Sequence, residues 1–82
     1  MQNNLYLLTT DGCHLCDIAK AMCLKLGIDV ELVDIIEDDS LVDLYGDKIP
    51  VLIADKAQQA LFWPFEQEQI EQYIEVYGIN SN

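Results

Sequence analysis

The sequence predicts an α/β domain with the element order β-α-β-α-β-β-α, a four-stranded mixed sheet flanked by helices. Two observations lead to this fold class. Short runs of apolar and β-branched residues alternate with segments whose apolar residues recur at helical spacing. Glycine and proline stand where one kind of segment gives way to the next. With 82 residues, of which 51% are hydrophobic, the chain is expected to form one domain over residues 1–82.

The first half of the chain supplies a strand, a helix and a second strand. Leu5 to Leu8 is a continuous apolar run, which is typical of a strand buried on both faces. A helix is predicted from Leu15 to Leu26, and Gly27 is a natural stop after it. The segment Ile28 to Ile36, rich in β-branched residues, predicts the second strand. The apolar residues expected on one face of the helix are Leu15, Ile18, Ala19, Met22, Cys23 and Leu26.

The second half predicts a short helix, a hairpin and a last helix. Residues 40–45 form the short helix, capped by the acidic run 37–39. The segment IPVLIAD predicts a third strand beginning at Pro50, and the fourth strand is expected at about Gln58 to Phe62. Pro64 is expected in the first turn of the last helix, which ends before Gly78.

The net charge of the chain limits the classes of molecule that it is expected to bind. Fifteen acidic residues stand against four lysines and no arginine, so the formal charge is −11. Such a chain repels phosphate backbones, which excludes nucleic acid as a partner. No apolar run approaches the roughly 20 residues of a membrane span, and residues 1–4 do not open a signal peptide. We therefore expect an acidic cytoplasmic protein, monomeric and away from membranes.

Cys13 and Cys16 lie where the first strand meets the first helix. This position puts the first sulfur beside the free N–H groups and the positive dipole end of the helix, which stabilise a thiolate and lower the thiol pKa below its ordinary value of about 8.5. Residues at i and i+3 share a helix face, so the two sulfurs can form and break a disulfide without remodelling the fold. Two thiols at this spacing on a βαβ unit indicate a redox pair.

Metal binding and core packing are the competing interpretations of the cysteines. A structural zinc site takes four ligands, and only His14 and Cys23 remain as further candidates, so no metal site is expected within one chain. An iron–sulfur cluster shared by the thiolates of two chains stays open. Cys23 lies on the apolar stripe of the helix and is assigned to the core.

Three segments together resemble the small bacterial glutaredoxin-like proteins of the thioredoxin superfamily: CHLC after an apolar strand, the later KIPVL, and FWPFEQEQIEQYI. The resemblance covers Leu5 to Tyr77 and implies the minimal thioredoxin or glutaredoxin fold. It also implies a thiol–disulfide oxidoreductase in which Cys13 is the nucleophile and Cys16 resolves the mixed disulfide, with no cofactor. By the same resemblance the Ile49–Pro50 bond is cis. It exposes the backbone of Ile49 to an extended substrate.

The sequence departs from glutaredoxins around this motif. Gly12 and Lys48 stand where glutaredoxins commonly have an aromatic residue and a threonine. The region that carries a Gly-Gly pair for glutathione reads FWPFEQEQ here. Glutathione therefore stays open as the electron donor, and a protein electron donor is favoured. The expected partners are thiols and disulfides of proteins or small molecules. Lys48 is expected to oppose the acids beside the motif, and His14 is either an exposed residue or a pH-sensitive tuner of the pair.

Two other functions remain open from the sequence. A thioredoxin-fold module could recognise a basic partner with little turnover, because the chain is strongly acidic. A dimer could hold an iron–sulfur cluster through its cysteines.

Overall fold

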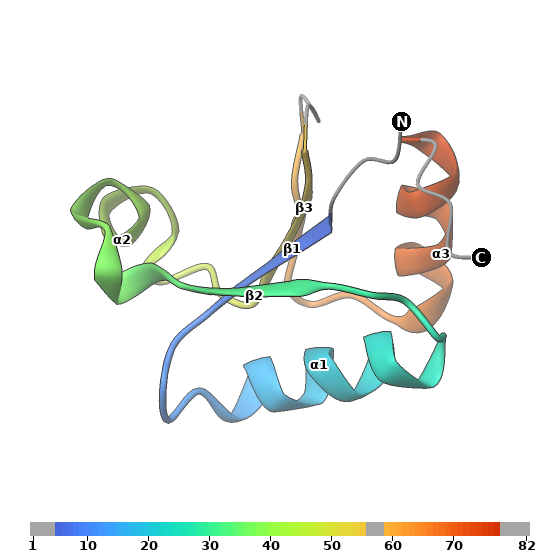
Figure 1. Cartoon of the computed structure of the whole chain (residues 1–82), viewed down its shortest axis with the longest axis horizontal. Helices are drawn as coiled ribbons and strands as arrows, with labels where there is room; N and C mark the ends of the chain where they lie inside the picture. The colour runs from blue at the N-terminus through green and yellow to red at the C-terminus, as the bar shows by residue number, and fades with distance from the viewer. Residues whose placement is uncertain (1–4, 56–58, 78–82) are drawn as a thin grey trace.

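The structure is a computed structural model that describes residues 5–55 and 59–77. It has the predicted order of elements, with one additional 3₁₀ turn (Figure 1). No helix among these residues has the length and apolar character needed to cross a membrane. The elements are β1 (Leu5–Thr9), α1 (His14–Lys25), β2 (Glu31–Asp34), η1 (Ile35–Glu37), α2 (Asp39–Tyr45), β3 (Val51–Ala54), β4 (Leu61–Phe62) and α3 (Gln67–Val76).

The four strands form one mixed sheet in the order β2-β1-β3-β4. β1 is parallel to β2, with Thr9 opposite Asp34, and antiparallel to β3, with Leu8 opposite Val51. The end of β1, the end of β2 and the start of β3 therefore meet at one edge of the sheet. This edge carries the turn that leads into α1.

Helices cover both faces of the sheet, and each face has its own apolar cluster. Successive strand residues point to opposite faces, so Leu7 faces α1 and α3 while Leu8 faces α2. In Figure 1, α2 stands apart from α1 and α3. The larger cluster consists of Leu5, Leu7, Ala19, Cys23, Ile28, Leu52, Ala54, Phe65, Ile70, Tyr73 and Ile74, and the smaller one is centred on Leu8, Ile35 and Val51.

The buried face of α1 differs from the predicted one. Leu15 and Ile18 were expected to face the core, but their side chains are 41% and 37% exposed. The fully buried residues are Ala19 and Cys23, as predicted, together with Cys16, which was not predicted on this face. These side chains are small, so the helix can approach the sheet closely along them. The buried face therefore keeps Ala19 and Cys23 of the predicted stripe, with Met22 and Leu26 packed against the core, and is shifted toward Cys16.

The second strand is shorter than the predicted segment Ile28 to Ile36. Only Glu31–Asp34 pairs with β1, because β1 is itself a short strand of five residues. The chain then turns into η1, where the Asp34 carboxylate accepts a hydrogen bond from the Ile36 N–H at 3.2 Å. This cap on the 3₁₀ turn ends the strand. The predicted acidic cap of α2 is confirmed, since the Asp38 side chain accepts from the Ser40 N–H at 2.9 Å.

The last two elements also start later than predicted. β4 is limited to Leu61–Phe62, and Gln58 lies outside the described residues. α3 begins at Gln67, so Pro64 precedes the helix rather than lying in its first turn, and the Trp63–Pro64 peptide is cis. A capping box between Glu66 and Gln69 determines the helix start, with the Glu66 N–H donating to Gln69 Oε1 at 2.7 Å.

Tyr73 ties α3 to the β3–β4 hairpin. Its buried hydroxyl accepts a hydrogen bond from the Ala54 N–H at 3.0 Å and donates to the Gln59 carbonyl at 2.7 Å. Burial raises the pKa of Tyr73 above its ordinary value of 10.0, although the hydrogen bond from Ala54 acts in the opposite direction. The folded protein therefore stabilises the protonated form of the Tyr73 hydroxyl.

Candidate redox site

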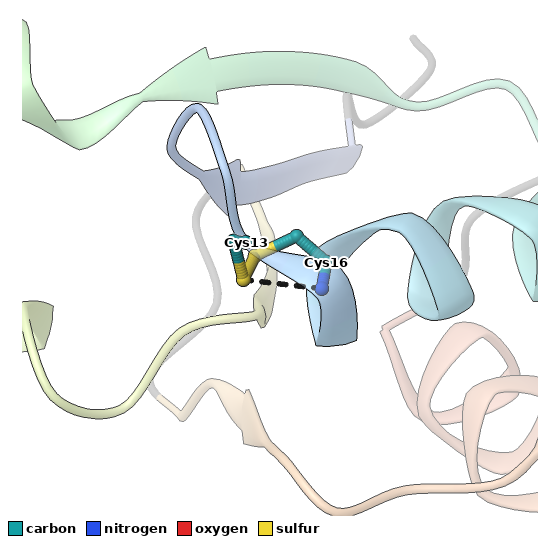
Figure 2. The surroundings of a disulfide bond; sticks show 2 residues. All are labelled: Cys13 and Cys16. Carbon is teal, nitrogen blue, oxygen red and sulfur yellow. Dashed lines mark hydrogen bonds between the residues drawn. A yellow bond between two sulfur atoms is a disulfide. The ribbon is translucent and has the colours of Figure 1, made fainter.

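Cys13 is the N-cap residue of α1 and forms a disulfide with Cys16 (Figure 2). Its backbone is extended, with φ −86° and ψ 101°, and the two Cα atoms are 5.2 Å apart. The Cys13 Sγ atom also accepts a hydrogen bond from the Cys16 N–H at 3.1 Å. The sulfur thus occupies the position that a serine or aspartate oxygen takes in an ordinary helix cap.

A tight turn between β1 and α1 sets this position. The Cys13 N–H donates to the Thr10 carbonyl at 3.4 Å, which closes the turn. Gly12 has φ 78°, a left-handed conformation that favours glycine. The polar turn after an apolar strand therefore delivers the first cysteine to the helix N-terminus, as the sequence predicted.

The two sulfurs of the pair differ in their access to solvent. Cys16 is only 2% exposed and lies on the face of α1 that packs on the sheet. Cys13 is half-buried, and the residues on either side of it, Gly12 and His14, are exposed. An incoming sulfur can therefore reach Cys13 but not Cys16. This difference separates the chemical roles that the two cysteines can play.

The other predicted site residues lie at the same edge of the sheet or at the start of α1. The Ile49–Pro50 peptide is cis and directly precedes β3. Because Val51 pairs with Leu8, the register brings this peptide to the edge that carries the β1–α1 turn. Pro50 is buried and Ile49 half-buried.

The two predicted basic residues of the site are exposed. Lys48 lies in the loop before β3, where its N–H donates to the Tyr45 carbonyl at 2.8 Å. His14 is the first residue of α1. No hydrogen bond of either side chain to the cysteines is formed among the described residues.

The third cysteine is part of the core. Cys23 is 1% exposed, as expected from its place on α1, and its thiol is free. Burial raises the pKa of the Cys23 thiol above its ordinary value. Its thiol is therefore held protonated and away from solvent. Within residues 5–55 and 59–77, no three histidine, cysteine or acidic residues gather in a way that could hold a metal ion.

A cavity of about 310 Å³ lies beside the disulfide, and the sequence did not point to it. Cys16 and the turn residues Thr10 to Gly12 line it, together with charged residues of α1, β2 and η1: Asp17, Lys20, Asp34 and Glu37. The sequence feature that could have indicated this cavity is Asp34 at the end of β2. Parallel strands end at the same edge of a sheet, so Asp34 was bound to lie near the residues that follow β1.

The match to a known protein family covers nearly the whole chain. The family model described as "Glutaredoxin-like domain (DUF836)" matches residues 4–75. The chain belongs to the glutaredoxin-like domain family. No curated protein matches this glutaredoxin-like chain.

Solved structures agree with this assignment. The X-ray structure of protein XcR50 from X. campestris is 32% identical to the glutaredoxin-like chain, with a TM-score of 0.78 over 88% of this chain and 96% of that one. The solution structure of Ne2328 from Nitrosomonas europaea is 28% identical, with a TM-score of 0.66 over 89% and 92%. Thioredoxin 1 from Thermosipho africanus TCF52B, at 22% identity and a TM-score of 0.56 over 92% and 98%, shares the fold. The predicted thioredoxin-like fold class is therefore confirmed.

Proposed function

We propose that this protein is a thiol–disulfide oxidoreductase that uses Cys13 as its nucleophile and Cys16 as its resolving thiol. The observation that carries the proposal is the unequal access to the two sulfurs. Cys13 is half-buried at the start of α1, whereas Cys16 is 2% exposed. In a dithiol mechanism of thiol–disulfide exchange, one sulfur meets the substrate disulfide and a second sulfur attacks the mixed disulfide that forms on the first.

The helix start supports the first step. In the reduced protein the Cys13 thiolate would lie at the positive end of the α1 dipole, and the Cys16 N–H that contacts Sγ at 3.1 Å would donate to the anion. This thiolate attacks one sulfur of a substrate disulfide. The substrate S–S bond breaks, a mixed disulfide with Cys13 forms, and the first substrate sulfur leaves as a thiolate that takes up a proton.

The second step returns the protein to the disulfide state described here. Cys16 loses its proton and attacks the Cys13 sulfur, and the second substrate thiol departs. Two electrons have then passed to the substrate, and the Cys13–Cys16 disulfide has formed. A thiol donor, either a dithiol protein or glutathione, must reduce this disulfide before the next cycle. The cis Ile49–Pro50 peptide lies at the same sheet edge, which supports Ile49 and Pro50 as a backbone contact for an extended substrate.

The test is a pair of single substitutions with a matched control. Cys13→Ser is expected to abolish reduction of a peptide disulfide, because the accessible nucleophile is gone. Cys16→Ser is expected to accumulate the mixed disulfide, seen as a mass increase equal to one half of the substrate. Cys23→Ala serves as the control, since Cys23 is a buried free thiol two helical turns after Cys16 on α1. If Cys13→Ser retains the activity of the unchanged protein, the proposed chemistry is wrong.

A further inference from the structure

The three residues that precede β3 offer no free backbone N–H group. The N–H groups of Lys48 and Ile49 both donate to the Tyr45 carbonyl, at 2.8 Å and 3.2 Å. Pro50, the next residue, has no N–H group. A substrate backbone that reaches this segment therefore finds no hydrogen-bond donor on the main chain of the protein.

The end of α2 explains why these two N–H groups are occupied. The last carbonyls of a helix have no partner inside the helix and must find one in the residues that follow. Tyr45 is the last residue of α2, and the N–H groups that reach its carbonyl come three and four residues later, at the spacing of a helical turn. A substrate that used the Ile49 N–H would have to break one of the bonds that end α2.

The Ile49 carbonyl is in the opposite situation. No hydrogen bond to it is formed within residues 5–55 and 59–77. A backbone carbonyl without a partner in the protein is paired with water or with a ligand, and Ile49 is half-buried rather than sealed in the core. The pairing of Val51 with Leu8 brings this segment to the sheet edge that carries the β1–α1 turn and the cysteine pair (Figure 2).

We propose that residues 48–50 form an acceptor-only edge, to which a substrate must donate a backbone N–H group. This inference rests on the proposed oxidoreductase function and specifies its substrate. Two extended chains can exchange two N–H···O bonds through one residue on each, but Ile49 supplies only the acceptor for one of them. The substrate is therefore a polypeptide disulfide whose cysteine lies in an extended segment with unpaired N–H groups. A cystine inside a helix or sheet is a poor substrate, because its N–H groups are already bonded.

Substrates with single ester bonds in the backbone measure this contact. A symmetrical peptide disulfide is compared with three analogues in which an ester oxygen replaces the N–H of the reacting cysteine or of either neighbour, and with a control ester placed far from the cysteine. Rate constants are measured for the reduced protein by quenching with an alkylating reagent and determining the masses, and each is divided by the rate constant of the same peptide with dithiothreitol. One of the three analogues is expected to react about 2-fold to 10-fold more slowly than the parent peptide, the effect of one hydrogen bond, and the control ester at the parent rate.

Nuclear magnetic resonance couplings across hydrogen bonds identify the donor and the acceptor directly. The isotopically labelled Cys16→Ser variant is converted into a mixed disulfide between Cys13 and a labelled peptide, which holds the substrate in place. A coupling from a peptide N–H to the Ile49 carbonyl carbon is expected. The coupling from the Ile49 N–H to the Tyr45 carbonyl carbon is expected both in the free variant and in the mixed disulfide.

The outcomes separate the two proposals. Equal normalised rates for the parent peptide and all its ester analogues would overturn the acceptor-only edge while leaving the oxidoreductase function intact. A coupling from the Ile49 N–H to a peptide carbonyl, or the absence of any coupling to the Ile49 carbonyl, would overturn it as well. If none of the peptides is reduced and no mixed disulfide forms on Cys13, the oxidoreductase function itself fails.

Discussion

Tyr73→Phe removes one oxygen atom that joins α3 to the sheet. The hydroxyl accepts from the Ala54 N–H at 3.0 Å, and Ala54 is 2% exposed, so the substitution leaves a buried donor without this partner. Such a loss costs about 1–3 kcal/mol. The bond to the Gln59 carbonyl adds little, because Gln59 is exposed and water can replace the hydroxyl.

We therefore expect the free energy of unfolding to fall by about 2 kcal/mol. For a domain of this size that loss corresponds to a melting temperature about 8–16 °C lower. Urea denaturation followed by circular dichroism measures it, and the m-value should stay unchanged. Tyr6→Phe is the control, because Tyr6 is half-buried and its hydroxyl has no hydrogen-bond partner in the described part of the chain.

The effect also depends on pH, with a definite sign. Burial raises the pKa of Tyr73 in the folded protein above 10.0, while in the unfolded chain the phenol ionises near its ordinary value. Unfolding then releases a proton above pH 10, so the stability contributed by Tyr73 decreases as the pH rises beyond that value. The difference between the unchanged protein and Tyr73→Phe should shrink over this range. A loss below about 0.5 kcal/mol at pH 7, no larger than that of Tyr6→Phe, would refute the reasoning.

Three further substitutions or reactions test the packing around the site. Gly12→Ala should lower the free energy of unfolding by about 1–2 kcal/mol in a denaturant titration, since φ is 78° and no atom lies within 4 Å of the added Cβ; Gly12→Asn should cost less. Leu52→Ala should cost about 2–5 kcal/mol by the same titration, because Leu52 is fully buried. Cys23 should react with a maleimide only after denaturation, since its thiol is buried and its pKa is raised, and rapid labelling of the folded protein would contradict its place in the core.

The order of elements and the place of the cysteine pair could be predicted because they depend on local patterns. Gly12 and the polar turn mark the start of α1, and Gly27, with φ 71°, marks the end of that helix. The acidic cap of α2 was predictable for the same reason, because Asp38 acts on an N–H group two residues away. Each of these features is determined within a few residues of the chain.

The errors arose where distant segments decide the outcome. Periodicity placed Ala19 and Cys23 in the core correctly, but the contact with the sheet also buries Cys16 and leaves Leu15 and Ile18 exposed. The length of β2 depends on its pairing with β1 rather than on its own β-branched residues. The start of α3 depends on Glu66, a residue type that is seldom recognised as an N-cap.

The cavity beside Cys16 could not be predicted from spacing along the chain. It brings together Asp11 after β1 and Asp34 at the end of β2, which are far apart in the sequence. Only the parallel pairing of Thr9 with Asp34 places their side chains around one space. A cavity of this kind depends on tertiary structure even when the reactive motif is local.

Competitive alkylation of the reduced protein tests the central claim most directly. A substoichiometric amount of iodoacetamide is added at pH 7, and the labelled residue is identified by peptide mass spectrometry. The unequal access to the sulfurs predicts that the label falls on Cys13, with Cys16 reacting far more slowly. Labelling of Cys16 ahead of Cys13, or an even distribution between them, would contradict the assignment of Cys13 as the nucleophile.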